Sequence, residues 1–190
     1  ISEGSRETLE LYHVPASAID YFGHGTTVAT NMIIERKGAK TALITTKGFR
    51  DILEIGRQTR PSLYNIFENK PDPLIERSLR LEVDERVRAD GEILRAVDPE
   101  EVRVLLRKLK AENVEAVAVC FLFSFLNPEN ERVAERCIKE EWPEAYVSLS
   151  SAILPEFREF ERLSTTVINA YLGPRMKLYI DNLRRRVREA

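Results

Sequence analysis

The sequence has few of the residues from which metal and redox sites are built. Among its 190 residues there are two cysteines, Cys120 and Cys137, and two histidines, His13 and His24. Neither cysteine belongs to a CxxC pair, and no cluster of cysteine, histidine and carboxylate residues has the spacing of a zinc site. Both cysteines lie among apolar residues, which argues against a disulfide framework. We therefore expect a cytoplasmic protein and no metal site built from its own side chains.

Long apolar runs and a surplus of one charge are absent as well. No stretch is long and apolar enough to cross a bilayer, and none looks like a signal peptide. The formal net charge is -2, from 29 basic and 31 acidic residues, so we expect no nucleic-acid partner and no membrane. The basic run Arg184–Arg188 fits the last turn of a helix, where positive side chains complement the helix dipole. No GxxxxGK[ST] phosphate loop occurs.

What the sequence does contain is an alternation of short apolar runs and amphipathic segments. Strands are predicted near 19–23, 40–46, 114–121 and 145–149. Helices are predicted over 2–12, 27–37 and 49–55, from Asp98, from Asn127, and over 157–171 and 174–188 with a break at Gly173-Pro174. This alternation favours an α/β fold with a mainly parallel sheet flanked by helices. We expect a single α/β domain over 1–190, with the C-terminal helices at about 157–190.

One segment departs from the alternation. Residues 56–75 contain three prolines and predict an irregular loop. Ser78–Val87 alternates apolar and charged side chains, and Asp90-Gly91 is a turn signal. These features predict a β-hairpin insertion at about 76–97.

Polar residues follow each predicted strand. Gly23–Thr27 comes after the first, Thr45–Gly48 after the second, Ser124 after the third and Ser150-Ser151 after the fourth. Because ligands of open parallel sheets bind beyond the carboxyl ends of the strands, these groups would share one rim. The alternative is that they are helix caps and ordinary loop residues, which serine and threonine favour.

Two short segments could hold a ligand. In Gly23–Thr27 the glycines allow close approach to a helix N-terminus, which could bind an anion or a polarised carbonyl. His24 could act there as a general acid or base, or have a structural role. In Gly56–Pro61, Arg57 and Arg60 could hold a carboxylate or phosphate, or anchor the loop through salt bridges.

Read together, several segments resemble the hydantoinase A / 5-oxoprolinase family. The resemblance runs in order over nearly the whole chain. It is carried by HGTTVATN (24–31), TALITTKGFRD (41–51), EIGRQ (54–58), VDER (83–86), SLSS (148–151), STT (164–166) and NAYLGP (169–174). The resemblance implies part of an actin-like (sugar-kinase/Hsp70-like) ATPase fold. The family's glycine-rich phosphate loop is not found here, so the chain looks like a fragment of the N-terminal region.

The resemblance also implies a function. The parent protein would be an ATP-dependent hydrolase of cyclic amides of the hydantoin or 5-oxoproline type, using ATP with Mg2+. It would be oligomeric and work with a hydantoinase B-type subunit or domain. The alternatives are an ATP-dependent ketone carboxylase subunit and a non-catalytic binding or assembly module. In this interpretation His24 is the catalytic candidate, and the residues expected to line the phosphate or substrate site are Gly25, Thr26, Thr27, Asn31, Arg57, Gln58 and Arg60.

Two positions depart from the family pattern. Where many members have a Leu-His-Ser-Tyr-like segment, this chain has Leu122-Phe123-Ser124-Phe125, and it has Asn130 where histidine is common. If those histidines touch metal or substrate, that role is absent here.

Overall fold

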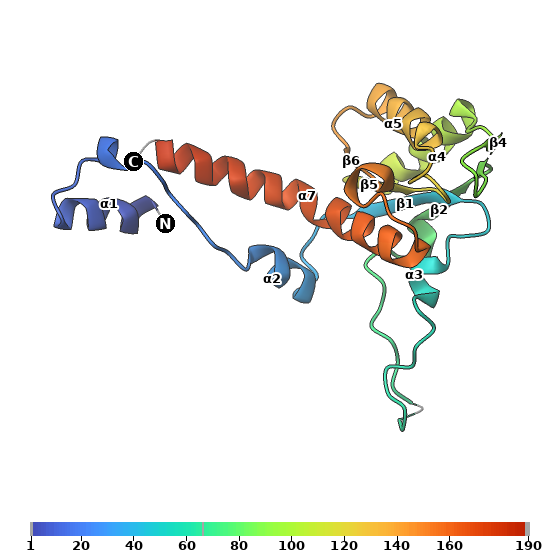
Figure 1. The fold of residues 1–190 in the computed structure, drawn as a ribbon, viewed down its shortest axis with the longest axis horizontal. Helices are drawn as coiled ribbons and strands as arrows, with labels where there is room; N and C mark the ends of the chain where they lie inside the picture. Colours follow the sequence, from blue (N-terminus) through green and yellow to red (C-terminus); the bar gives the residue numbers. More distant parts are fainter. Residues whose placement is uncertain (1, 66, 189–190) are drawn as a thin grey trace. The chain divides into compact units, whose positions relative to one another are not determined.

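The computed structural model describes residues 2–65 and 67–188, which fall into two compact units (Figure 1). The first unit joins the N-terminal segment up to Lys37 with the C-terminal segment from Arg175, and the second is Gly38–Pro174. The first contains α1 (Ser2–Leu11), η1 (Ala16–Ala18) and α2 (Val28–Ile34). That residues 1–190 act as one domain stays a prediction.

The second unit is built on a four-stranded parallel sheet, so the predicted fold class is confirmed. Its strands lie in the order β2 (Arg80–Val83), β1 (Thr41–Thr46), β5 (Ala116–Cys120) and β6 (Tyr146–Leu149). Every neighbouring pair is parallel. All residues of β1 and β5 are buried, as expected of central strands covered on both faces.

Helices cover both faces of this sheet. Figure 1 shows α4 (Pro99–Ala111) and α5 (Glu129–Glu141) on one face and the first part of α7 (Glu159–Arg188) on the other. The start of α4 is set by Asp98, whose side chain accepts a hydrogen bond of 2.9 Å from the backbone N–H of Glu100. The core joins the apolar stripes of these helices to the strands. Short helices α3 (Ile52–Ile55), α6 (Ser150–Ile153) and η2 (Arg77–Leu79) complete the unit.

The prediction of a strand at 19–23 is wrong. These residues form no strand, and Tyr21 is 85% exposed. A strand is stable only when a neighbour pairs with its backbone groups, and the place beside β1 is taken by β2. The sheet therefore has the predicted number of parallel strands, but Arg80–Val83 replaces 19–23.

The hairpin predicted at 76–97 is correct only in its second part. β3 (Arg86–Val87) and β4 (Ile93–Arg95) pair antiparallel around the turn at Asp90-Gly91, where Gly91 has a φ of 87°. The first part of the segment is β2, which joins the main sheet in parallel. Alternation of apolar and charged residues did not distinguish a hairpin strand from the edge strand of the parallel sheet.

The predicted helix break at Gly173-Pro174 is also wrong. α7 continues through Pro174 without interruption. A proline removes one backbone N–H donor from a helix, which is a loss that packing of the surrounding turns can offset. Gly173 instead allows the helix to pack closely against β6, because a methyl group at this position would lie 2.2 Å from the ring of Tyr146.

Within the described residues, no helix is long and apolar enough to cross a membrane.

Candidate functional site

Polar side chains gather inside the carboxyl edge of the sheet. Thr46 ends β1, donates a hydrogen bond to Glu85 and accepts one of 3.0 Å from the backbone N–H of Leu122. Asn130 donates to the other carboxylate oxygen of Glu85 at 2.7 Å. Burial raises the pKa of Glu85, against the opposing effect of these hydrogen bonds. Asn130 also bonds the backbone of Arg95 and Val97, so it has a structural role at this departure from the family pattern.

A second buried carboxylate joins the ends of β5 and β6. Glu131 is fully buried and accepts hydrogen bonds from the N–H of Phe121 at 3.0 Å, from the N–H of Ser151 at 2.9 Å and from the hydroxyl of Ser150 at 2.5 Å. Ser150 lies 3.0 Å from the hydroxyl of Ser124. The expected convergence of polar groups at one edge is thus confirmed for three of the four strand ends, although Thr46, Ser124 and Ser150 bond protein groups in the interior.

The structure adds a residue that the sequence did not reveal, Arg162. It lies in the first turns of α7 and is 1% exposed. Its Nη2 donates to the carbonyl of Phe121 at 2.8 Å, and the guanidinium lies over the ring of Phe125 at 5.2 Å. Opposite charges three and four residues apart around this position indicated surface ion pairs. In the folded chain the guanidinium instead braces the turn that follows β5.

Neither cysteine has the environment of a nucleophile or a metal ligand. Both are buried and free of disulfides. Burial raises the pKa of the Cys120 thiol to about 11, so the thiolate is scarce at neutral pH. No group of three or more metal-binding side chains occurs in the described part of the chain.

The candidates of the first unit lie on and before α2. The Nε2 of His24 is 2.7 Å from the hydroxyl of Tyr179, a residue of the same unit. The hydroxyl of Thr26 accepts a 3.2 Å hydrogen bond from the N–H of Val28, but the N-cap of α2 is Thr27 and not Thr26, and Thr27 makes no side-chain capping bond. The other candidates here, Gly25, Thr27 and Asn31, are exposed.

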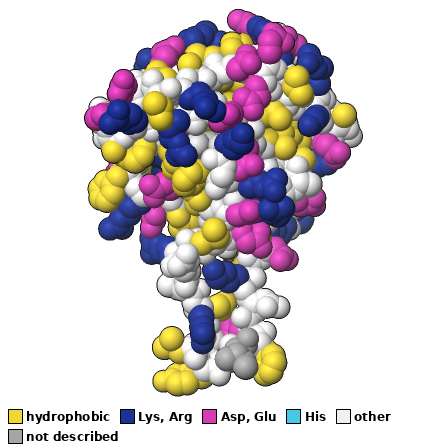
Figure 2. Space-filling view, turned by 90° about the vertical axis from the view of Figure 1, so that its right-hand side faces the viewer, with side chains coloured by type: hydrophobic (Ala, Val, Ile, Leu, Met, Phe, Trp, Pro, Cys, Tyr) yellow, Lys and Arg dark blue, Asp and Glu magenta, His cyan; other side chains and the backbone are white. Residues whose placement is uncertain are grey.

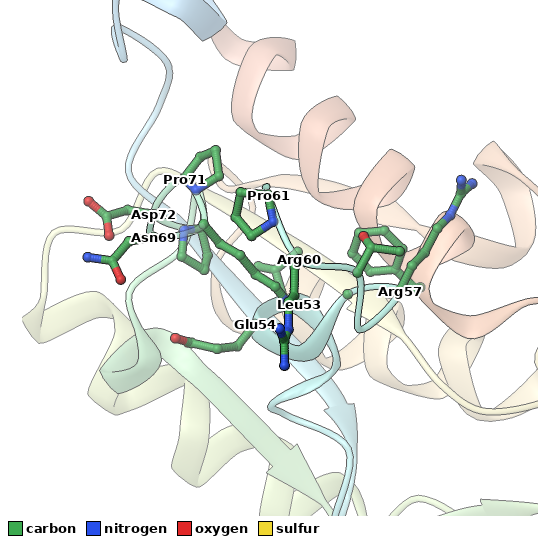
Figure 3. A pocket seen from close by; sticks show the side chains of 13 residues that line it. Leu53, Glu54, Arg57, Arg60, Pro61, Asn69, Pro71 and Asp72 are labelled. Carbon is green, nitrogen blue, oxygen red and sulfur yellow. The ribbon is translucent and has the colours of Figure 1, made fainter. Parts of the chain in front are cut away.

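The candidates of the second unit border an open cleft of about 930 Å³, which we call the α3 cleft (Figure 3). It lies in the connection that follows β1, between α3 and the loop after it. Both Arg57 and Arg60 line it, while Gln58 does not. The complete lining is Leu53, Glu54, Gly56, Arg57, Thr59, Arg60, Pro61, Asn69, Lys70, Pro71, Asp72, Pro73 and Phe160.

The basic side chains of the α3 cleft differ in the hydrogen bonds and ion pairs that they make with other protein groups. Arg57 bonds Glu161 through Nε and Nη2, both at 2.8 Å, and in Figure 3 its guanidinium points away from the group around Pro71. Lys70 donates to the carbonyl of Ile55 at 2.9 Å. Arg60 makes no hydrogen bond or ion pair within the described residues. It is the cleft's uncommitted cation and the group best suited to an anionic ligand.

Comparison with known proteins identifies the family. The sequence model of the protein family described as the hydantoinase/oxoprolinase N-terminal region matches residues 1–142. The chain belongs to this family. It is 36% identical to 5-oxoprolinase 1 of Arabidopsis thaliana over 94% of its length. It is 37% identical to the acetophenone carboxylase gamma subunit of Aromatoleum aromaticum over 84% of its length.

The chain also shares its fold with a solved structure. The crystal structure of the ATP-dependent caprolactamase from Pseudomonas jessenii matches 96% of the chain with a TM-score of 0.87 and 32% identity. This likeness is consistent with the actin-like ATPase fold that the sequence resemblance implies. The chain spans 16% of the oxoprolinase, 24% of the carboxylase subunit and 27% of the caprolactamase chain.

Proposed function

We propose that the complete polypeptide carrying this chain is an ATP-dependent hydrolase of cyclic amides, such as hydantoins, 5-oxoproline or lactams. The supporting observation is the match of 96% of the chain to an ATP-dependent caprolactamase at a TM-score of 0.87. The likeness to 5-oxoprolinase 1 supports the same reaction class. The chain would contribute one part of the site, since it spans only 16–27% of these relatives.

ATP, with Mg2+, would supply a phosphoryl group that turns a stable amide oxygen into a good leaving group. Cationic and hydrogen-bonding side chains must hold such phosphates and the negative charge that develops. In this chain the α3 cleft provides some of these cationic side chains. Its Arg60 is an uncommitted guanidinium, and Arg57 and Lys70 add positive charge nearby. We propose that Arg60 binds a phosphate or carboxylate group of a substrate.

The role of Arg60 predicts a binding defect. In the complete enzyme, Arg60→Ala is expected to raise KM about tenfold for the substrate whose anionic group it holds, with a smaller effect on kcat. Steady-state kinetics with ATP and the cyclic amide varied in turn shows which substrate that is. Arg107→Ala is the matched control, because it removes an exposed arginine of α4 that does not line the cleft. Unchanged KM values for both substrates in Arg60→Ala would remove Arg60 from the site.

The other site residues also remain proposals. His24 is proposed as a catalytic acid or base, with Gly25, Thr26, Thr27 and Asn31 lining a ligand beside it and Gln58 beside Arg57. Its exposed ring and its hydrogen bond to the Tyr179 hydroxyl are compatible with proton transfer. A His24→Ala enzyme that folds normally and turns over at the normal rate would end that role.

The assembly is proposed from the same comparisons. The acetophenone carboxylase relative is named as a gamma subunit, and we propose that the protein works in the cytoplasm with a hydantoinase B-type subunit or domain, as an oligomer.

Substrate-dependent release of ADP tests the proposed function. The complete protein and its partner are assayed with hydantoin, 5-oxoproline, caprolactam and acetophenone, each with and without bicarbonate. We expect ADP release to depend on a cyclic amide and to be independent of bicarbonate. Turnover with acetophenone that requires bicarbonate would instead assign the carboxylase reaction. No turnover under any condition would favour a binding or assembly module.

A further inference from the structure

The α3 cleft is lined by acidic as well as basic side chains. Its charged residues are Glu54, Arg57, Arg60, Lys70 and Asp72. Glu161, which does not line the cleft, pairs with Arg57 and offsets its charge. The remaining lining then has equal numbers of basic and acidic side chains. On its own it has no surplus of positive charge with which to hold an anion.

A further guanidinium lies behind one of these acidic residues. Arg80, the first residue of β2, does not line the cleft, and its side chain is 2% exposed. Its Nη1 donates a hydrogen bond of 2.9 Å to Oε2 of Glu54, and its Nε donates one of 3.0 Å to the carbonyl of Ile75. The carboxylate of Glu54 is therefore balanced from the interior, and the cleft as a whole has a positive surplus.

The neighbouring carboxylate of Asp51 does not take Arg80 away from Glu54. Arg77 donates two hydrogen bonds of 2.9 Å to Asp51, one from Nε and one from Nη2, and they lower the pKa of the Asp51 carboxyl. The Nη1 of Arg80 lies 4.0 Å from Asp51 but 2.9 Å from Glu54. Each arginine thus has its own carboxylate partner.

Stability of the fold gives little reason for a buried arginine at this position. A buried guanidinium loses its hydration, and an ion pair adds little or no stability compared with apolar side chains of similar size. What the Arg80–Glu54 pair does change is the charge of the cleft that Glu54 lines.

No broad basic surface supplies the positive charge instead. Figure 2 shows acidic and basic side chains interspersed over one face of the second unit. In Figure 3 the guanidinium of Arg57 points away from Glu54 and Arg60. The sign of the charge around Arg60 therefore depends on a few local groups, and Arg80 decides it.

We propose that Arg80 is a positioning residue that makes the α3 cleft selective for an anion by holding and neutralising Glu54. Arg60 would contact the phosphate or carboxylate group directly, and Arg80 would keep Glu54 from repelling that group. The proposal rests on the function proposed above for Arg60. It goes further by assigning a role to a residue outside the cleft and to the acidic residue that it holds.

The test measures binding of ATP with Mg2+, and separately of 5-oxoproline, to the complete polypeptide by isothermal titration calorimetry. The informative probe is the one whose Kd rises in Arg60→Ala. For that probe, Glu54→Gln is expected to lower the Kd about threefold, because Arg80 then has no carboxylate to balance. Arg80→Met should raise the Kd about fivefold, because the charge of Glu54 is then uncompensated.

The double variant separates the effect of charge from structural support. Arg80→Met/Glu54→Gln should return the Kd to within about twofold of the wild-type value, whereas a purely structural role would leave it as weak as in Arg80→Met. All these shifts should shrink with added sodium chloride. Glu140→Gln is the matched control, because Glu140 also pairs with an arginine but does not line the cleft, and its Kd should not change.

Several outcomes would overturn the proposal. A Kd that rises or stays the same in Glu54→Gln is one, and it does not depend on whether Arg80→Met folds. The absence of rescue in a double variant that is folded by circular dichroism is another. A third is that Arg60→Ala changes neither Kd, which would also remove Arg60 from the site.

The ADP assay is independent of this test. The expected pattern of Kd values without turnover would contradict the proposed reaction alone. Turnover of a cyclic amide without that pattern would contradict the role of Arg80 alone.

Discussion

Replacing Glu131 with alanine is expected to lower the free energy of unfolding of the second unit by about 3–5 kcal/mol. The carboxylate is fully buried and accepts three hydrogen bonds, from the N–H groups of Phe121 and Ser151 and from the hydroxyl of Ser150. Alanine leaves the N–H groups of Phe121 and Ser151 without this acceptor, leaves the Ser150 hydroxyl only its contact with Ser124, and opens a cavity at the carboxyl edge of the sheet. Each buried donor left unpaired costs about 1–3 kcal/mol.

Urea denaturation of the 190-residue chain measures this effect. The single tryptophan, Trp142, is buried at the end of α5 and reports on the second unit by fluorescence. Glu140→Ala is the matched control, because this glutamate of the same helix is largely exposed, and its loss should cost no more than about 1 kcal/mol. Glu131→Gln keeps the size and one acceptor oxygen, so an intermediate loss is expected. Equal stability of Glu131→Ala and Glu140→Ala would contradict the role assigned to the buried carboxylate.

Replacing Gly173 with alanine is expected to destabilise the chain by about 1–3 kcal/mol, although alanine is the better helix former. The added methyl group would lie 2.2 Å from Cζ and 2.4 Å from Cε1 of Tyr146. The ring must then move, which also breaks the 3.3 Å hydrogen bond from its hydroxyl to Asn169. The helix preference of alanine over glycine, about 1 kcal/mol, is too small to offset this overlap.

A double-mutant cycle separates these two effects. In a Tyr146→Ala background the overlap is gone, so Gly173→Ala should stabilise the chain by about 1 kcal/mol through helix propensity alone. The change of sign between the two backgrounds is the expected signature. If Gly173→Ala has the same effect in both, the glycine is present for a reason other than close approach of the ring.

The parts of the fold that the sequence predicts well are those in which local signals agree. Asp98 caps a helix whose apolar residues, among them Val102 and Leu106, recur at helical spacing, and the structure has that helix and that cap. The uniformly apolar run around Val117 is a central strand. In both cases the local preference and the burial of the segment favour the same structure.

The errors arise where the outcome depends on distant partners. Ile19–Gly23 has the composition of a strand, but the strand that pairs with β1 is Arg80–Val83. Gly173-Pro174 has the composition of a helix break, but Gly173 packs against Tyr146 of β6, which lies 27 residues earlier in the sequence. No local pattern contains either contact.

The site shows the same limit. The polar ends of β1, β5 and β6 converge as predicted, because parallel strands bring their carboxyl ends to one edge. Sequence alone did not reveal that these groups are buried, nor that Arg162 is buried and bonds the carbonyl of Phe121 after β5. Arg57 and Arg60 do share a cleft, but only the structure shows that Arg57 pairs with Glu161, whereas Arg60 has no hydrogen bond or ion pair among the described residues.

The most direct measurement of the central claim counts ADP and ring-opened product in the same reaction of the complete enzyme. If ATP activates the amide oxygen for hydrolysis, each ring opened should release one ADP, and neither product should form when ATP or the cyclic amide is left out. Ring opening without ADP, or ADP release at the same rate with and without the cyclic amide, would contradict the proposed reaction.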